Sequence, residues 1–170
     1  SGRVAIDIAA KEPCKTVVDV MAGGDSALIR AREGFEDSEA SGVAAIDALR
    51  LSAFDMVVLI SASGSALFNV GAGKAARAAG ATVYYFCNSK VVPPETKVLF
   101  DAHGVIPVII DIGPQAITGS TRLQAATLAM LCLGAVCLDL EPKDMRAQLL
   151  AGNQVIAKNL EAIAAVVGAE

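Results

Sequence analysis

The sequence has no tryptophan, and aromatic residues make up only 4% of its 170 residues. Proteins that bind single-stranded nucleic acid stack the bases on aromatic side chains, so this scarcity argues against that class. Positive charge is also scarce, because 14 lysines and arginines face 18 acidic residues and the net charge is −4. Duplex binding requires a basic surplus that displaces counterions. We therefore expect no nucleic-acid partner.

Long uninterrupted apolar runs are absent, although the mean hydropathy is +0.54. The longest apolar stretch, residues 123–140, contains Gln124, Thr127, Gly134 and Asp139. This pattern predicts a buried helix and no membrane-spanning segment. Charged residues at positions 3, 7, 11 and 12 interrupt the first apolar segment, so no signal peptide is predicted. We expect a cytoplasmic protein with no membrane partner.

Motifs for metals and nucleotides are also lacking. The four cysteines form no C-x-x-C pair, and His103 is the single histidine, which gives a zinc site poor support. Gly71-Ala72-Gly73 fits a dinucleotide pattern but lies within a helical pattern, well after the preceding strand. Gly73-Lys74 lacks the other residues of a P-loop. We therefore expect no metal and no nucleotide cofactor.

The residues that are abundant predict a single α/β domain. Hydrophobic residues make up 54% of the chain, and a chain of this length buries roughly 70% of its unfolded surface. Apolar β-branched runs, typical of strands covered on both faces, occupy residues 16–20, 56–60, 82–87 and 105–111. Helical patterns occupy residues 26–35, 42–49, 66–79, 120–140 and 143–167. The alternation of strands and helices in the first two thirds of the chain predicts a parallel sheet.

Two hydroxyl-rich segments, together with a third polar loop at Ser1-Gly2-Arg3, are predicted to lie at the carboxyl edge of this sheet, where ligands of open α/β sheets bind. Ser61, Ser63 and Ser65 surround Gly64 directly after a strand, a set that suits a phosphate monoester. Residues 118–122 combine three hydroxyls with an arginine that can grip an oxyanion. Each segment can also be explained as helix capping alone.

Acidic residues and the histidine supply further candidates. Glu33, Glu36, Asp37 and Glu39 cluster around Gly34-Phe35, either as acid–base groups or as a solvated helix end. The lone histidine lies beside Gly104 in a predicted loop, where it is a general base or an incidental residue.

Several of these segments together resemble one family, the sugar isomerase (SIS) phosphosugar-binding domains. The chain is most similar to N-acetylmuramic acid 6-phosphate etherases and to the related glucokinase regulatory proteins. The resemblance rests on Ser1-Gly2-Arg3, on Met-Ala-Gly-Gly-Asp-Ser-Ala-Leu at 21–28 and on Glu-Gly-Phe-Glu-Asp at 33–37. It continues through Ser-Ala-Ser-Gly at 61–64 and Cys-Asn at 87–88, and ends with Gly-Pro-Gln-Ala-Ile-Thr-Gly-Ser-Thr-Arg-Leu at 113–123.

The resemblance implies a flavodoxin-like three-layer α/β sandwich with a parallel sheet that binds an amino-sugar 6-phosphate. The etherases of the family eliminate D-lactate from C3 of the sugar and then add water. The family's two catalytic glutamates correspond to Glu36 and, with a one-residue insertion, to Glu12; without the insertion the latter position is Lys11. The implied substrate-binding residues are Ser1, Gly2, Arg3, Ser61, Ser63, Gly64, Ser65, Ser120, Thr121 and Arg122.

Three functions remain open at this point: an etherase-type lyase, a non-catalytic phosphosugar sensor, and an aldose–ketose phosphosugar isomerase. The etherase-type lyase is the leading interpretation. The sensor is the alternative, because Ser65 and Gln124 stand where the family has an arginine and a lysine, and residues 65–68 are similar to the corresponding loop of the regulatory relatives. An isomerase would use His103 as its base. In each case the expected partner is a small sugar phosphate. Members of the family commonly form dimers, so the resemblance also implies a homodimer.

The start of the chain bears on the fold. In the flavodoxin-like order 2-1-3-4-5 the first strand lies between the second and the third. Residues 4–10 read as a helix after the Ser-Gly-Arg loop, with no strand ahead of them. We therefore expect residues 1–170 to be a single SIS-type domain whose first strand is missing, with C-terminal helices at 120–140 and 143–167. Such a chain should not fold alone unless another segment replaces that strand.

Overall fold

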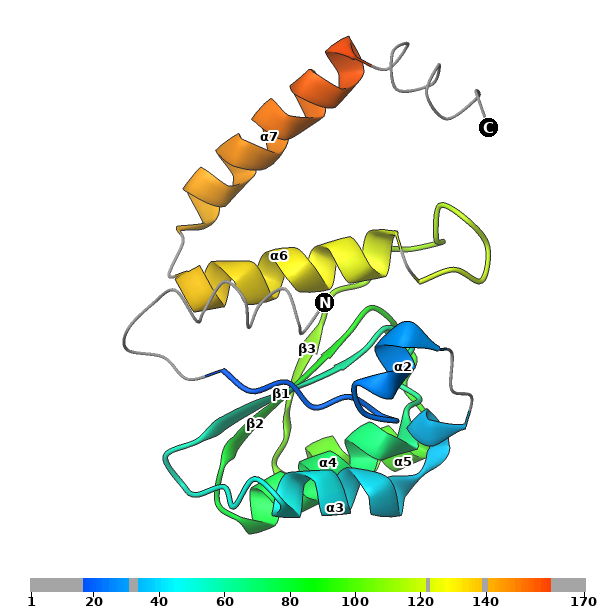
Figure 1. Ribbon diagram of the computed structural model, residues 1–170, viewed down its shortest axis with the longest axis vertical. Helices are drawn as coiled ribbons and strands as arrows, with labels where there is room; N and C mark the ends of the chain where they lie inside the picture. Colours follow the sequence, from blue (N-terminus) through cyan, green and yellow to red (C-terminus); the bar gives the residue numbers. More distant parts are fainter. Residues whose placement is uncertain (1–16, 31–33, 122, 139–140, 160–170) are drawn as a thin grey trace.

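The computed structural model describes residues 17–30, 34–121, 123–138 and 141–159. At its centre lies a parallel sheet in the order β1-β2-β3, formed by Met56–Ser61, Thr82–Cys87 and Ile106–Ile109. Helices cover both faces, with α3 (Glu39–Asp47), α4 (Leu67–Ala78) and α5 (Pro94–His103) on one side and α6 (Gln124–Leu138) on the other (Figure 1). The architecture is the predicted α/β, flavodoxin-like one.

The core lies around β2, the central strand. Val83, Tyr85 and Cys87 are fully buried in it, and Leu99 from α5 is equally buried against them. The ring of Tyr85 meets that of Phe100 edge-on, with the centroids 5.7 Å apart. A strand buried on both faces needs apolar residues at every position, which explains why β2 lacks a polar alternation.

Glycines allow α3 and α4 to cross at backbone distance. A Cβ atom at Gly42 would overlap the carbonyl oxygen of Phe68, and one at Gly71 would overlap that of Glu39. Gly73 faces the sheet, where a Cβ would lie 3.0 Å from Leu59 Cδ1. The glycines at 71 and 73 therefore serve helix packing, and their predicted position within a helix is confirmed.

Most of the predicted elements agree with the structure, some with shifted ends. Strands β1 and β2 and helix α4 match within two residues, and Gly80 follows α4 with a φ of +89° as a helix-terminating glycine. Three elements are shorter than predicted, namely β3, α6 and, within the described residues, α7 (Pro142–Lys158). Helix α5 was not predicted; it begins at Pro94, a residue suited to the first turn.

Two predictions near the start of the described chain are wrong. Residues 17–20 form no strand, because no described residue pairs with them in the sheet. Residues 26–35 form no continuous helix. Helix α2 (Ser26–Ile29) ends where Arg30 is extended, and Gly34, with a φ of +80°, begins a separate 3₁₀ turn, η1 (Phe35–Asp37).

Strand β1 lies at an edge of the described sheet. Its inner side pairs with β2 from Met56 to Ser61. On the outer side, the Asn69 side-chain amide donates a hydrogen bond to the Ile60 carbonyl oxygen at 2.9 Å. An amide side chain here takes the place of a neighbouring strand's N–H group.

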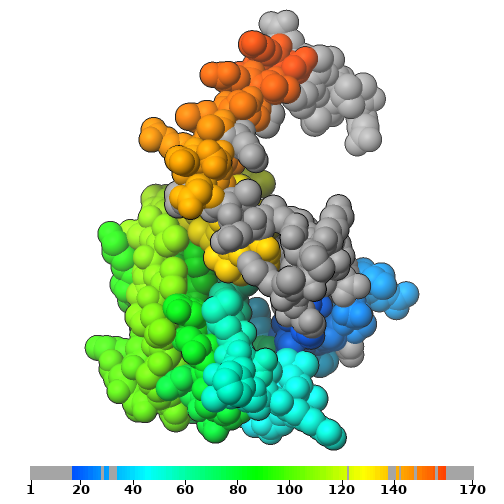
Figure 2. Space-filling view, turned by 90° about the vertical axis from the view of Figure 1, so that its left-hand side faces the viewer, coloured from blue at the N-terminus to red at the C-terminus, as the bar shows by residue number. Residues whose placement is uncertain are grey.

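The two C-terminal helices differ in how closely they approach the sheet. Helix α6 buries Ala125 and Ala129, whereas Leu150 and Val155 on α7 are 54% and 60% exposed. Figure 2 shows α7 projecting from the body of the molecule. No helix in the described part of the chain is both long and apolar enough to cross a bilayer.

Candidate functional site

A hollow of about 450 Å³ lies at the carboxyl ends of the three strands. Because the strands are parallel, the segments that leave β1, β2 and β3 all emerge at this edge. The hollow is lined by Ala62, Ser63, Asn88, Ser89, Lys90, Val91, Asp111, Gly113, Gln115 and Thr121. We call it the strand-end hollow; most of its lining residues carry polar side chains.

Gly64 fixes the loop that follows β1. Its φ of +79° is a left-handed conformation that favours glycine. The Gly64 N–H donates to Ser61 Oγ at 3.1 Å, and the fully buried Thr96 hydroxyl donates to the Gly64 carbonyl oxygen at 2.6 Å. The hydroxyls of Ser63 and Ser65 lie 2.7 Å apart, within hydrogen-bond distance. Hydrogen bonds to the N–H and to the carbonyl oxygen of Gly64 therefore fix this loop, and the fixed loop places the Ser63 hydroxyl at the hollow.

Asn88 joins the three strand-end loops. Its side chain is 8% exposed, and its Nδ2 donates to the Ile110 carbonyl oxygen at 3.2 Å. Its backbone N–H donates to the Ala62 carbonyl oxygen at 3.0 Å. Asn88 is thus bonded to one neighbouring segment by its side-chain amide and to the other by its backbone N–H, so the floor of the strand-end hollow is preorganised.

Lys90 and Asp111 form an ion pair at the strand-end hollow, with Nζ and Oδ2 2.9 Å apart. The hydrogen bond from Lys90, helped by the Gly113 N–H at 3.0 Å, lowers the pKa of Asp111. The same contact raises the pKa of Lys90. The Lys90 side chain is 76% exposed, so its charge remains accessible to an anion.

The segment before α6 forms the remaining wall. Thr121 lines the strand-end hollow, and its carbonyl oxygen accepts a hydrogen bond from the Ala126 N–H at 3.1 Å. The Gln124 side chain folds back, where Oε1 accepts from the Ala116 N–H at 2.6 Å. Gln115 Oε1 is buried beside the hollow and has no hydrogen-bond partner among the described residues.

The structure brings two of the predicted binding residues, Ser63 and Thr121, to the same hollow. Four others lie in the two loops without lining it: Ser61, Gly64, Ser65 and Ser120. Glu36 is exposed on η1 and does not line the strand-end hollow. Ser1, Gly2, Arg3, Glu12 and Arg122 lie outside the described residues.

His103 ends helix α5, so its predicted place in a loop is wrong. Its carbonyl oxygen accepts a hydrogen bond from Arg77 Nε at 2.9 Å, and it does not line the strand-end hollow. Within the described ranges no group of three or more metal-ligating side chains occurs.

Sequence reasoning missed Asn88 as a structural residue of the hollow, and Lys90 and Asp111 entirely. The available signal was their position, because Asn88 and Lys90 follow a predicted strand and Asp111 is the last residue of the next one. The lysine and the aspartate are 21 positions apart, so only the pairing of β2 with β3 brings them together.

Comparison with known proteins points in one direction. No protein-family model matches the chain. The chain is 35% identical over 124 residues to the N-acetylmuramic acid 6-phosphate etherase of Deinococcus radiodurans. This match covers 73% of the chain and 39% of that protein. It is 39% identical over 121 residues to the etherase of Bacillus subtilis, covering 71% and 38%, and 40% identical over 121 residues to that of an Exiguobacterium species, covering 71% and 39%.

The match covers unequal shares of the proteins compared. The matched residues span about two fifths of the length of these curated relatives. Over nearly three quarters of its own length, the chain is thus similar in sequence to N-acetylmuramic acid 6-phosphate etherases.

Proposed function

We propose that the chain is the phosphosugar-binding SIS domain of an etherase-type lyase that acts on N-acetylmuramic acid 6-phosphate. The strand-end hollow carries this proposal, because it is polar, preorganised and placed where α/β sheets bind ligands. The similarity to proteins named for this etherase activity supplies the substrate class. Residues 1–170 then belong to one domain in a cytoplasmic protein.

The sugar phosphate is held by the two hydroxyl-bearing loops. Ser63 and Thr121 line the strand-end hollow and donate hydrogen bonds to phosphate oxygens. The other proposed binding residues of these two loops are Ser61, Gly64, Ser65, Ser120 and Arg122. Ser1-Gly2-Arg3 forms the third binding loop. The family's arginine and lysine are replaced here by Ser65 and Gln124, and Lys90 supplies positive charge in their place. A charge-assisted hydrogen bond is stronger than a neutral one, so we expect the lysine to matter more than any single hydroxyl.

The reaction needs a base and an acid. The base removes the acidic proton at C2, beside the carbonyl carbon, and the C2–H electron pair becomes the C2–C3 double bond as the C3–O bond breaks. The acid protonates the departing D-lactate oxygen, and water then adds to the double bond. Glu36 and its companion Glu12 are the proposed pair, since carboxyl groups serve as acid or base when their surroundings adjust their pKa.

The test is incubation with N-acetylmuramic acid 6-phosphate and enzymatic measurement of released D-lactate. Glu36→Gln should reduce lactate release by about 100-fold or more while the sugar phosphate still binds. The matched control is Glu95→Gln, because Glu95 is an exposed carboxylate in the first turn of α5. A protein that neither binds the sugar phosphate nor releases lactate contradicts the proposal. Full activity in Glu36→Gln removes Glu36 from it.

One observation favours a sensor as the second candidate. Glu36 is exposed on η1 and does not line the strand-end hollow, whereas Ser63 and Thr121 do. A protein that had kept binding and lost catalysis would show this division. Saturable binding in calorimetry, with no lactate after prolonged incubation, would select the sensor over the lyase.

A homodimer is part of the proposal. The described residues of α6 and α7 expose Met130, Leu150 and Val155, apolar side chains that a second copy could cover. Sedimentation should give a dimer, and Leu150→Asp should shift it towards monomer. Phe54→Asp, a change at a fully exposed residue on the β1 side of the molecule, is the control. A monomeric wild-type protein contradicts this part.

A further inference from the structure

The hydroxyl group of Tyr85 is a buried polar group that the proposed reaction does not use. Tyr85 lies on β2, where it is fully buried between Leu59 of β1 and Pro107 of β3. Its ring packs edge-on against Phe100, so the side chain lies on the face of the sheet that α5 covers. The hydroxyl has no hydrogen-bond partner among the described residues. An unpaired buried hydroxyl destabilises a fold, whereas phenylalanine would fill the same space without this cost.

Three polar side chains surround this hydroxyl. Burial raises the pKa of Tyr85, and three nearby side chains oppose the rise, namely those of Thr96, Ser61 and Asn69. They belong to the first turn of α5, to the end of β1 and to α4. Their oxygen atoms carry lone pairs that can accept a hydrogen bond. The Tyr85 hydroxyl therefore lacks a partner because of a small displacement and not because acceptors are missing.

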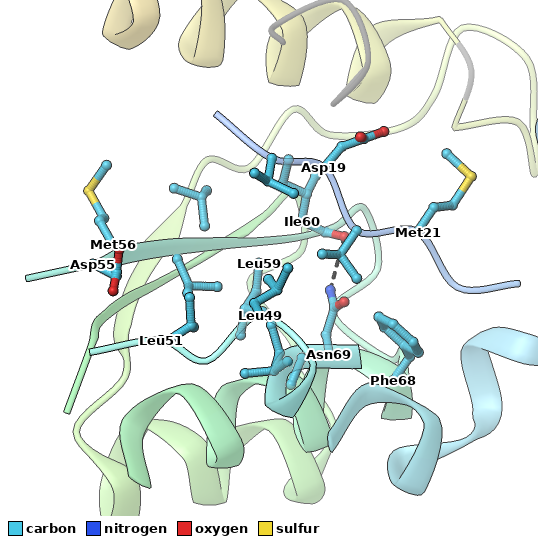
Figure 3. Close-up of a pocket in the computed structure, with 16 residues that line it drawn as sticks. Asp19, Met21, Leu49, Leu51, Asp55, Met56, Leu59, Ile60, Phe68 and Asn69 are labelled. Atoms are coloured by element: carbon cyan, nitrogen blue, oxygen red, sulfur yellow. Dashed lines mark hydrogen bonds between the residues drawn. The ribbon is translucent and has the colours of Figure 1, made fainter. Parts of the chain in front are cut away.

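The same three side chains hold the backbone where β1 ends. Asn69 Nδ2 donates to the Ile60 carbonyl oxygen, and Figure 3 shows this bond at a second hollow of about 450 Å³ along the outer edge of β1. Ser61 Oγ accepts a hydrogen bond from the Gly64 N–H. The Thr96 hydroxyl donates to the Gly64 carbonyl oxygen. The cluster therefore supports the loop that leaves β1 for the strand-end hollow.

Ser61 is the member of this cluster that a ligand can move. Thr96 is fully buried in α5, and Asn69 is bonded to β1, whereas Ser61 is half-buried at the start of the loop. In the proposed function, residues 61–65 bind the phosphate group. A loop that closes on a ligand shifts its own side chains relative to the core beneath it. Closure therefore changes the distance between Ser61 Oγ and the Tyr85 hydroxyl.

We propose that the Tyr85 hydroxyl is a positioning group for residues 61–65, and that it donates a hydrogen bond to Ser61 Oγ when this loop closes on a phosphate. This role rests on the proposed function of the strand-end hollow. Before closure the unpaired hydroxyl lowers the stability of the fold, and after closure its hydrogen bond favours the bound state. Tyr85 thus lowers stability and raises affinity, as groups at functional sites often do.

Tyr85→Phe tests both effects in the full-length protein. Without ligand, its midpoint of thermal unfolding should rise by about 2–4 °C, because the unpaired hydroxyl is gone. Calorimetry with N-acetylmuramic acid 6-phosphate, in a Glu36→Gln background that prevents turnover, should show binding weakened by about 10-fold. A hydroxyl with a purely structural role would not raise stability and weaken binding together. A lower midpoint or unchanged binding overturns the proposal.

Tyr84→Phe is the matched control. It removes the same group from the neighbouring residue of β2, whose side chain points to the opposite face of the sheet. Its unfolding midpoint and its affinity should equal those of the wild-type protein. A wild-type protein that binds no sugar phosphate contradicts the proposed function and this role together. Equal binding by the wild-type protein and Tyr85→Phe contradicts the role of Tyr85 alone.

A double-mutant cycle identifies the partner of the hydroxyl. Ser61→Ala removes the proposed acceptor, so adding Tyr85→Phe to it should weaken binding no further. Thr96→Val keeps that acceptor, so Tyr85→Phe should still weaken binding by about 10-fold in this background. A full loss in the Ser61→Ala background, or none in the Thr96→Val background, contradicts Ser61 as the partner.

Discussion

The two hollows have the same volume, about 450 Å³, but opposite surroundings. The strand-end hollow is lined by polar side chains from three loops, and Asn88 and Gly64 hold those loops by backbone-directed hydrogen bonds. The second hollow, the β1 groove along the outer edge of β1, is lined mostly by apolar side chains, with Asp19, Asp55 and Asn69 among them. Polar groups already fixed in place are typical of a ligand site, whereas an apolar hollow beside an open edge is typical of an incomplete core. Cavity size alone therefore says nothing about function here.

Residues of α3 and α4 line the β1 groove but not the strand-end hollow, so Gly71→Ala at the crossing of these helices should have the largest effect, on the groove side of the comparison. The new methyl group would overlap the Glu39 carbonyl oxygen, and overpacking of this kind costs about 3 kcal/mol. Urea unfolding measures the loss. The control is Gly134→Ala on α6, where a Cβ meets nothing within 4 Å and the stability should hold or rise. Similar stability in the two variants contradicts the backbone contact.

Gly64→Ala should damage the strand-end hollow and leave the β1 groove intact. Alanine is strained at a φ of +79°, and its Cβ would lie 3.0 Å from Val92 Cγ1. We expect a loss of about 1–2 kcal/mol together with weaker sugar phosphate binding. Gly24→Ala shares the left-handed backbone but faces open space, so it separates the strain from the clash. Unchanged sugar phosphate binding in Gly64→Ala would show that the loop is not part of the site.

Thr96→Val should give a smaller loss of the same kind. The side chain is fully buried and donates to the Gly64 carbonyl oxygen, so valine keeps the volume and leaves that oxygen without its donor. The expected cost is about 1 kcal/mol. Thermal unfolding measures it, with Thr82→Val at an exposed position as the control. Equal unfolding midpoints would mean that water replaces the Thr96 hydroxyl.

The smallest effect concerns the ion pair at the strand-end hollow. Lys90 and the Gly113 N–H hold the pKa of Asp111 below its ordinary value of 3.8. Because the folded-state pKa is the lower one, the stabilisation is present above pH 3.8 and is lost as the pH falls through the lowered pKa. Carbon-13 NMR of the carboxyl group should show this, and Lys90→Met should return the pKa towards its ordinary value.

Asp55, whose pKa is also lowered, serves as the reference for the titration of Asp111. Ser52 hydrogen bonds lower the pKa of Asp55, far along the chain from Lys90. The Asp55 titration should therefore be the same in the wild-type protein and in Lys90→Met. An Asp111 titration that also stays the same would show that the ion pair does not form in solution.

Local pattern predicted the parts of the fold whose surroundings are complete. Strand β2 and helix α4 were predicted correctly, because the apolar run of the one and the small-residue helical pattern of the other are visible in the local sequence. Residues 17–20 are also largely apolar, although Asp19 interrupts them, but they are not part of the described sheet. The apolar pattern of a segment shows which element it can form, and pairing with a neighbouring strand decides whether a strand forms.

The candidate site divides in a similar way. The hydroxyl loops were found from sequence because their residue types are concentrated within a few positions. Lys90 and Asp111 were missed because their contact depends on the register between β2 and β3. Asn88 was noticed only as part of a resemblance, and its role as a tie between loops required the backbone geometry of both neighbours.

The Asn69 amide at the Ile60 carbonyl oxygen also limits how far the sheet can be extended. An added strand would find this rung of the ladder already occupied, so its bonds to β1 would be restricted to the groups of Met56 and Val58. Growth of the sheet would stop before the loop that follows Ser61. One side chain thus separates assembly of the core from the end of the sheet where a ligand enters.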